Sequence, residues 1–331
     1  MDTEKNKDIV VSFLYCTSSQ ALSLHEQRIL LRLIEMAQCA ITGIKLKDNL
    51  GKVEHGLWDR YVSMPISSIF ERNMTHRDVI STLDKLSQRY IVIEDEQQWS
   101  KISLINSPKY HKYSGQMRFS VDNQLWNAFL DFSKGYRSFE MSRAMQLTST
   151  YAVRLYLLMS GQKTPLYFSI ERLKDILGIE PDKYKDTKGK HRIDHLEQRV
   201  LKPSQQQLNS TCPYSFTYEK IREVEGYQRS PVIGIRLYPV FLPGNRDTNL
   251  EQRKLLAQIS IASIPDEALC YLRNFGFTED EIKRNKPTLL AACEVLDLVE
   301  LLSHVSGRAR QAKNPKGYIV NAIKKAIKEN S

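Results

Sequence analysis

The stretch Lys188 to Asn209, KGKHRIDHLEQRVLKPSQQQLN, decides how the rest of the sequence is interpreted. Read as a helix, it has apolar or small residues at steps of three and four, the spacing of one buried stripe. These residues are Ile193, Leu196, Val200, Ser204 and Leu208. The opposite stripe holds only side chains that can donate a hydrogen bond, and none is acidic. These are His191, Arg192, His195, Arg199, Lys202 and Gln206. Such a helix fits the major groove of DNA, and a solvated surface helix is the alternative reading.

Length and composition predict a globular protein with two or three domains. The chain has 331 residues, of which 41% are hydrophobic and 26% charged. Its net charge of +10 favours a polyanionic partner, either nucleic acid or an anionic membrane surface. The longest apolar stretch, Leu289 to Leu302, is interrupted by carboxylates, and the charged N-terminus MDTEKNKD is unlike a secretory signal. We therefore expect a cytoplasmic protein that does not act at a membrane.

The first half of the chain predicts helices before strands. Ser23 with Glu26 forms an S-x-x-E capping box, so a helix should begin there, after a loose arm of residues 1–20. Its apolar positions fit one face: Leu24, Ile29, Leu30, Leu33, Ile34 and Ala37. A long loop over Lys45 to Tyr61 and a short helix or turn over Pro65 to Phe70 should follow.

The next helix, His76 to Tyr90, is the expected DNA-reading helix of this half. Thr75 with Asp78 can cap its start. The expected inner stripe is Val79, Ile80, Leu83 and Leu86. The expected outer stripe is Arg77, Ser81, Lys85 and Gln88.

Three β-rich runs follow this helix and predict the wing of a winged helix. They are YIVIED, WSKISLI and QMRFSV, and the segment Ser107 to Gly115, SPKYHKYSG, precedes the last. In this fold the third helix enters the groove while the hairpin loop contacts the DNA backbone. The predicted loop mixes cations with aromatic residues, which suits phosphates. It offers Lys109, Tyr110, His111, Lys112 and Tyr113. A solvated hairpin tip is the alternative.

The second half repeats the same order. Asp122 caps a short helix, and residues 133–138 form the connection. A helix over Thr150 to Ser160 contains Arg154, for which we expect a structural role, and Ser169 caps the next helix. The basic stretch, with a kink at Pro203, and two strands complete the repeat. This duplication predicts an α+β fold with two tandem winged helices, which can occupy successive major grooves about 10 base pairs apart. The expected segments are an N-terminal arm (1–20), two winged-helix domains (21–134 and 135–243) and a helical C-terminal region (244–331).

The last 85 or so residues are predicted to be helical. The expected helices are Asn249 to Ile261, Asp266 to Phe275 and Thr288 to Val305, with a capping box at Thr278 and Glu281. Seven cations follow before the first acid, Glu329. They are Arg308, Arg310, Lys313, Lys316, Lys324, Lys325 and Lys328. A solvated basic tail and an added contact with DNA or a partner are both consistent with this run.

No enzyme motif is present in the sequence. It lacks a G-x-x-x-x-G-K-[ST] loop, an HExxH pair and the H-x-H pair of rolling-circle initiators. The five cysteines are scattered without CxxC spacing, so we expect reduced thiols and no zinc site. We therefore predict no catalysis, no metal and no cofactor.

Several segments resemble the iteron-binding initiator replication (Rep) proteins of theta-replicating plasmids. The matches are LSLHEQRILLRLIEMAQ, FEMSRAMQLTSTYAVRLYLLMSG, FSIERLKDILGI and HLEQRVLKPSQQQLN. They span residues 10 to 240 in the family's order. The patterns Y-A-x-R-L-Y and R-V-L-K-P-x-x-x-x-L-N are the most specific.

The resemblance implies binding to repeated sequences in double-stranded origin DNA through both winged helices. It also implies opening of an adjacent AT-rich segment and recruitment of the host replication initiator and helicase. The first winged helix is implied to form a homodimer and contact DNA, and the second to be the main DNA reader. The DNA contacts expected on the two helices are Lys190, His191, Arg192, His195, Arg199, Lys202, Arg77, Ser81 and Lys85. The predicted wing adds Lys109 and Lys112. A winged-helix transcriptional regulator and a primosome-type protein-interaction scaffold remain the alternatives.

Overall fold

The computed structural model divides the chain into two compact units. Unit 1 comprises Met1–Leu24 with Lys134–Ser263, and unit 2 comprises His25–Ser133 with Ile264–Ser331. The residues that the structure describes are 7–18, 21–42, 51–56, 59–70, 74–94, 99–130, 135–187, 189–224, 230–250 and 264–330.

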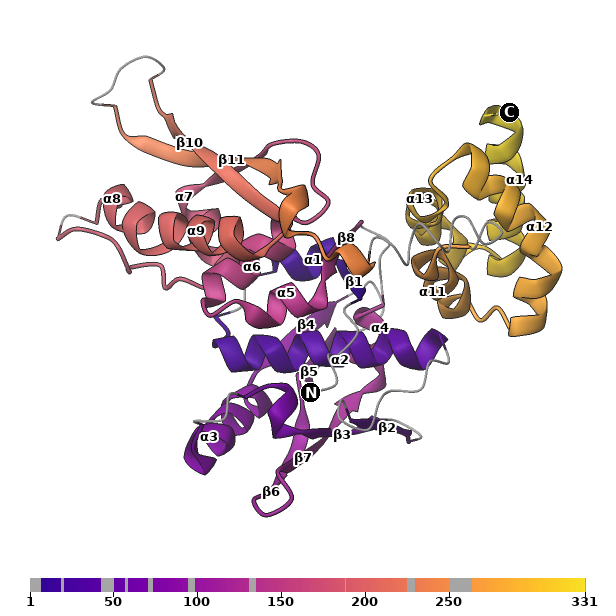
Figure 1. The fold of residues 1–331 in the computed structure, drawn as a ribbon, viewed down its shortest axis with the longest axis horizontal. Helices are drawn as coiled ribbons and strands as arrows, with labels where there is room; N and C mark the ends of the chain where they lie inside the picture. Colours follow the sequence, from indigo (N-terminus) through magenta and orange to yellow (C-terminus); the bar gives the residue numbers. More distant parts are fainter. Residues whose placement is uncertain are drawn as a thin grey trace. The chain divides into compact units, whose positions relative to one another are not determined.

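Most of unit 1 repeats the predicted order of helices and a hairpin. Its elements from residue 134 onward are β8 (Tyr136–Glu140), α5 (Met141–Gln146), α6 (Thr150–Met159), β9 (Leu166–Ser169), α7 (Ile170–Ile176), α8 (Ile193–Leu196), η2 (Glu197–Leu201), α9 (Lys202–Thr211), β10 (Tyr214–Arg222), β11 (Val232–Phe241) and η3 (Pro243–Asn245). Strands β10 and β11 form a long antiparallel hairpin, and β9 pairs with β11 to give the sheet order β10-β11-β9 (Figure 1). The predicted sequence of helix, helix, basic helix and hairpin is confirmed.

Helix α6 forms the centre of this unit. The Ser149 hydroxyl caps it by accepting a hydrogen bond from the Ala152 N–H. Arg154, in its middle, is only 2% exposed and donates to the carbonyls of Ile176, at 2.9 Å, and Ser18. Burial lowers the pKa of its guanidinium. The structural role predicted for Arg154 is confirmed, and its partners are backbone carbonyls.

The expectation of a loose N-terminal arm is wrong for residues 8–17. Strand β1 (Asp8–Ser12) pairs antiparallel with β8, and helix α1 (Phe13–Thr17) follows it. Ile9, Val10 and Val11 are buried. Three consecutive apolar residues, all β-branched, favour a strand, and its partner lies more than 120 residues further along the chain.

The first part of unit 2 contains the predicted first winged helix. Its elements are α2 (Leu24–Thr42), β2 (Lys52–His55), β3 (Asp59–Pro65), η1 (Ile66–Ser68), α3 (His76–Ser87), β4 (Tyr90–Glu94), β5 (Trp99–Ser103), β6 (Asn106–His111), β7 (Gln116–Asp122) and α4 (Asn123–Ala128). The strands form a four-stranded sheet in the order β2-β3-β7-β6 and a separate hairpin, β4-β5. The long loop expected over Lys45 to Tyr61 is wrong where β2 and β3 lie, and its residues 45–50, 57 and 58 are outside the described part. The caps at Thr75 and Asp122 are confirmed.

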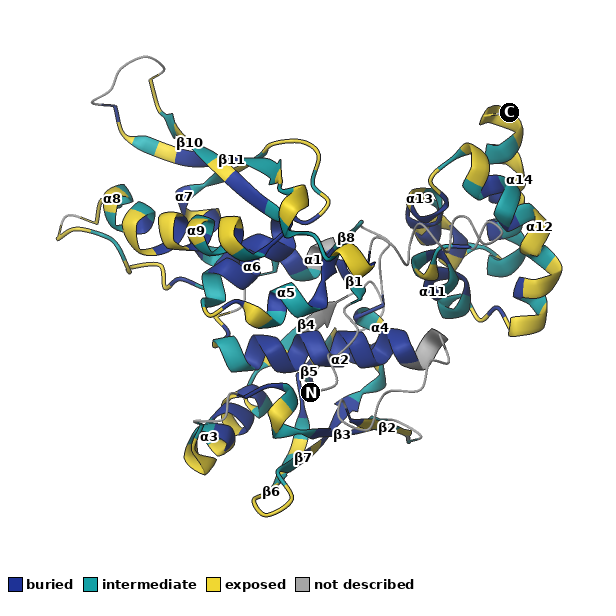
Figure 2. Ribbon diagram, viewed as in Figure 1, coloured by how far each residue is buried: buried dark blue, intermediate teal, exposed yellow. Residues whose placement is uncertain are grey.

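Helix α2 is buried on nearly all sides, contrary to the single apolar stripe expected (Figure 2). Its buried charges have partners within the unit. Arg32 binds Glu35 at 2.7 Å, and Glu26 binds the Arg89 guanidinium at 2.7 Å. Arg28 donates to the carbonyl of Ile69. Because these charged groups are paired or hydrogen-bonded within the unit, a helix rich in polar residues can lie in the core.

The C-terminal part of unit 2 is helical. Its helices are α11 (Asp266–Asn274), α12 (Glu279–Val295), α13 (Leu298–Gln311) and α14 (Pro315–Asn330). The capping box of Thr278 and Glu281 is confirmed. The predicted helix Thr288 to Val305 is wrong, because Leu296 is extended and the Asp297 carboxylate caps a new helix. The helix expected from Asn249 lies mainly outside the described residues. Within the described part, no helix has the length and apolar character needed to cross a membrane.

Candidate nucleic-acid interface

The basic helix of unit 1 begins later than the sequence suggested. Arg192 is its N-cap, and α8, η2 and α9 form one continuous run from Ile193 to Thr211. Before the helix, the N–H of Lys190 donates to the Asp186 carboxylate at 2.9 Å, which places Lys190 in a turn. Lys190 and His191 therefore precede the helix, although the sequence placed them on it.

A π turn interrupts this helix at Pro203. Proline has no N–H to donate to the carbonyl four residues earlier, and its ring crowds that carbonyl. The helix is wider at this turn, and the Lys202 N–H donates to the carbonyl of Glu197, five residues back. The wide turn buries two consecutive residues, Val200 and Leu201. The kink expected at Pro203 thus takes the form of a π turn.

The two stripes predicted for this helix are largely confirmed. Leu196, Val200, Ser204 and Leu208 are each no more than 1% exposed, whereas Ile193 is only half-buried. Ile193 was expected inside, but it lies in the first helical position, at the edge of the packed region. The outer side chains of Arg192, Arg199, Lys202 and Gln206 are exposed, and His195 is half-buried. A firmly packed stripe therefore holds the cations at the surface.

His191 and Glu171 tie the start of the helix to α7. The His191 Nε2 lies 2.8 Å from a Glu171 carboxylate oxygen. The Glu171 backbone N–H lowers the pKa of that carboxyl, with further lowering from His191. His191 was predicted to touch DNA, but here its ring is mostly buried and paired within the protein. Its contact suits it to position Lys190 and Arg192.

The helix from Ile193 to Thr211, the predicted recognition helix of unit 1, is joined to the hairpin through Glu197, an acid that the sequence reading did not use. Its carboxylate accepts hydrogen bonds from the Tyr218 hydroxyl at 2.7 Å and the Lys220 ammonium at 3.0 Å, and Lys202 lies at 3.5 Å. Burial raises the pKa of Glu197, but these donors outweigh it, so its pKa is lowered. Tyr218 and Lys220 are two residues apart in a predicted strand, so their side chains lie on the same face of it. This spacing is the only sequence signal for the cluster.

We expect Glu197→Gln to lower the free energy of unfolding by about 1 kcal/mol at pH 7, the scale of a partly exposed charged hydrogen bond. The pKa of Glu197 is depressed in the folded state, so its stabilisation is present above the unfolded value. It is lost as pH falls from 4.5 through the lower folded pKa. Urea unfolding of both proteins from pH 7 to 3 measures this. A gap between the two proteins that grows on acidification would contradict the assignment.

A cleft of about 780 Å³ lies between the start of this helix and the hairpin. Its cationic lining residues are Lys190, Arg192, Lys220 and Arg222, and its acids are Glu171 and Asp194. Arg222 donates to the carbonyl of Ser230 at 2.6 Å, so its position is fixed. Sequence reasoning found only two of these cations, because the others come from the wing strand.

In unit 2, helix α3 presents a smaller cationic face. Thr75 and Asp78 form a full capping box, and the Thr75 hydroxyl is the main cause of the lowered pKa of Asp78. Arg77 and Lys85 are exposed, and Ser81 is half-buried. Ile80, predicted to be inside, is 46% exposed, because the packed positions are Val79, Thr82, Leu83 and Leu86. This face also exposes an acid, Asp84, beside Lys85.

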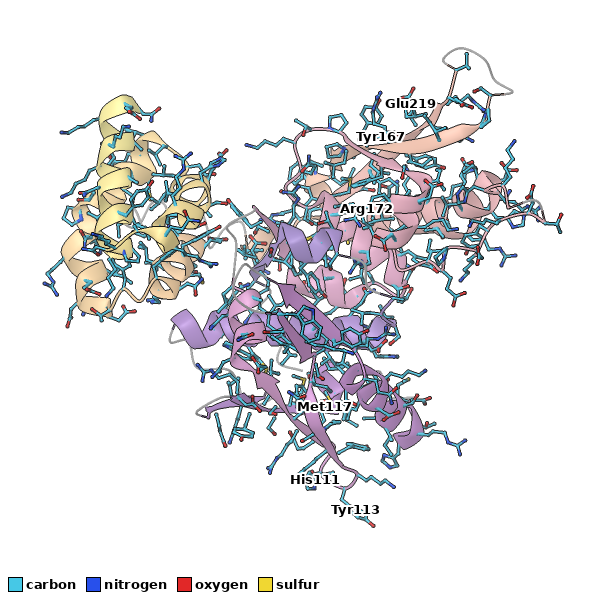
Figure 3. The ribbon with its side chains drawn as sticks, turned by 180° about the vertical axis from the view of Figure 1, so that it is seen from behind. His111, Tyr113, Met117, Tyr167, Arg172 and Glu219 are labelled. Atoms are coloured by element: carbon cyan, nitrogen blue, oxygen red, sulfur yellow. The ribbon has the colours of Figure 1, made fainter. Side chains whose placement is uncertain are left out.

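The hairpin β6-β7 is the wing of unit 2, but its loop is shorter than predicted. Residues 106–111 are strand, so Lys109 lies opposite Arg118 in the sheet, and only Lys112 to Gly115 form the turn. The Tyr110 hydroxyl lies 2.6 Å from the His76 Nδ1, which joins the wing to the start of α3. Tyr113 is fully exposed at the tip (Figure 3). Lys109 and Lys112 are also exposed.

Comparison with known families identifies both modules. The family model described as "Initiator Replication protein, WH1" matches residues 12–160. The model described as "Initiator Rep protein, WH2" matches residues 169–237. No curated protein matches the chain.

Proposed function

The chain belongs to the family of plasmid initiator replication (Rep) proteins, and we propose that it binds repeated sequences in the duplex DNA of a plasmid origin through both winged helices. In this proposal it then promotes opening of an adjacent AT-rich segment and recruits the host replication initiator and helicase. It forms a homodimer through the first winged helix. It acts by binding, without catalysis.

One observation carries the proposal. The helix from Ile193 to Thr211 has a fully buried stripe, and its opposite side exposes Arg192, Arg199, Lys202 and Gln206. Arginine and glutamine are the side chains that hydrogen-bond guanine and adenine edges in the major groove. The neighbouring cleft adds two cations from the wing, at Lys220 and Arg222. Together they support one surface that contacts both bases and phosphates.

Footprinting of the purified protein on the DNA flanking its own gene tests this function. We expect protection of direct repeats, each spanning roughly two helical turns, beside an AT-rich tract. Protection of a short palindrome alone would indicate a transcriptional regulator instead. Absent or salt-insensitive duplex binding would indicate a protein-interaction scaffold, because phosphate contacts impose a steep salt dependence.

The wing of unit 2 makes a separate prediction. Lys112→Ala should weaken binding to all sequences alike and reduce the slope of log K against log salt by about 0.9, the value for one phosphate contact. Binding titrations at four salt concentrations measure the slope. Lys163→Ala, an exposed lysine in the turn before β9, is the matched control and should leave it unchanged. Equal slopes for wild type and Lys112→Ala would remove the wing from the interface.

A further inference from the structure

The C-terminal helices lie outside both family models, and their charges are separated along the chain. Residues 264–300 carry eight acidic and four basic residues, a net charge of −4. Residues 301–331 carry seven basic residues and one acid, Glu329, a net charge of +6. A protein surface stays soluble when acidic and basic residues are mixed, so solubility does not explain why they are separated here.

The structure shows that this basic segment is folded. Ile319 and Ile323 of α14 are fully buried, as is Ala309 of α13, and α13 packs against α14. The apolar stripes therefore lie inside the helical bundle, and the cations are held on its outside. The cations therefore lie on a folded helical surface, and whether a partner binds them is a separate question.

Two of the seven cations have partners inside the bundle. Lys316 pairs with Glu281 at 2.9 Å, and the Arg310 guanidinium lies 6.0 Å from the centre of the Phe275 ring. The backbone N–H of Thr278, together with Lys316, lowers the pKa of Glu281 to about 2. These two cations stabilise the bundle.

The other five cations are exposed: Arg308, Lys313, Lys324, Lys325 and Lys328. Among the described residues, the only ion pair formed by these five is Lys325 with Glu329 at 3.6 Å, and both side chains are more than 60% exposed. Such pairs contribute little, because water and salt screen them. The five charges are therefore available to a partner.

We propose that the exposed lysines of α14, Lys324, Lys325 and Lys328, form a third DNA-binding surface, which binds the phosphate backbone of duplex DNA without sequence preference. A helix rises 1.5 Å per residue, so Lys324 and Lys328 are about 6 Å apart along α14. Duplex DNA carries one charge per about 1.7 Å of its axis, so a row of this length meets several phosphates. Lysine provides a point charge on a flexible stem, which suits phosphates better than base edges.

The bundle fits duplex DNA better than two other polyanions. An amphipathic helix that binds a membrane needs an exposed apolar face, and the apolar stripe of α14 is buried. Single-stranded nucleic acid is bound by stacking on exposed aromatic side chains. The one aromatic residue of α13 and α14, Tyr318, is half-buried.

The test compares two full-length variants that each lose three positive charges. The first is Lys324→Gln with Lys325→Gln and Lys328→Gln. The matched control is Lys283→Gln with Arg284→Gln and Lys286→Gln. It removes three exposed cations from α12, where the nearby acids Glu279, Asp280 and Glu281 offset their charge. Binding to a duplex that lacks the recognised sequence is measured against salt, with thermal unfolding of each variant.

We expect the α14 variant to bind this duplex roughly tenfold more weakly at 0.1 M salt, with a slope smaller by about 2.7, and the control to match wild type. Equal losses in both variants would show an effect of net charge alone and overturn the proposal, as would an unchanged slope. Loss of binding to anionic vesicles or to single strands, without loss of duplex binding, would overturn it too. If the triple variant unfolds, Lys328→Gln alone should reduce the slope by about 0.9.

The test of the α14 surface can succeed or fail separately from the test of the proposed function. The α14 variant should keep its footprint on the repeats, because the winged helices are intact. A reduced slope in a protein that shows no specific footprint would leave the third surface standing and remove the origin-binding role.

Discussion

Arg199→Ala is expected to weaken binding to the recognised sequence by about 1–3 kcal/mol and to relax the preference at one base position. Arg199 is exposed on the outer face of the recognition helix, whose other side holds fully buried Leu196, Ser204 and Leu208. Its planar guanidinium can donate two hydrogen bonds to a guanine edge. Titration against the wild-type repeat and against single-base variants measures both effects. Arg192→Ala should behave in the same way at another position.

Arg199→Lys is the matched control for this prediction. It keeps the positive charge but loses the fork geometry, so the salt slope should stay at the wild-type value while base preference is lost. If Arg199→Lys behaves like wild type, the side chain contacts phosphate and reads no base. If Arg199→Ala leaves affinity unchanged, the helix does not face DNA.

Leu208→Ala should lower the free energy of unfolding of unit 1 by about 2–5 kcal/mol. The side chain is fully buried at the C-terminal end of the recognition helix, so truncation removes apolar contacts and leaves a cavity. Guanidinium or urea unfolding, followed by fluorescence and circular dichroism, measures this. The loss should also weaken DNA binding near the unfolding midpoint, because the outer cations are held in place by the buried stripe.

Gln206→Ala on the same helix serves as the comparison for Leu208. Its side chain is exposed, so its effect on stability should stay within about 0.5 kcal/mol. Similar stability losses for Leu208→Ala and Gln206→Ala would mean that the stripe is not the packed face.

Local signals in the sequence predicted much of the fold. The caps at Thr75, Asp122, Ser169 and Thr278 each start a helix in the structure. These motifs act within three or four residues, so their effect can be read without the rest of the fold. The repeated order of helices and hairpin, and the stripes of the recognition helix, rest on equally local periodicity.

Features that depend on distant residues were missed. Strand β1 pairs with a strand over 120 residues away, and β2 and β3 are completed by β7. The Asp297 cap was overlooked because apolar residues continue on both sides of it. Helix α2 is buried all round since its charges find partners such as Arg89, which no local pattern shows.

The candidate site was only partly predictable for the same reason. The exposed cations of the recognition helix follow from its period, but Lys220 and Arg222 reach the cleft from the wing. His191 and Glu197 have partners inside the protein that the sequence did not show. The π turn at Pro203 adds Leu201 to the buried residues of the helix, next to the predicted Val200.

Hydroxyl-radical footprinting of one repeat tests the central claim, that two winged helices bind duplex DNA together. With wild-type protein we expect two protected patches about one helical turn apart on one face of the duplex. Arg199→Ala should reduce protection in one patch, and the double change Arg77→Ala with Lys85→Ala should reduce it in the other. A single patch, or loss of the same patch in both variants, would contradict the claim.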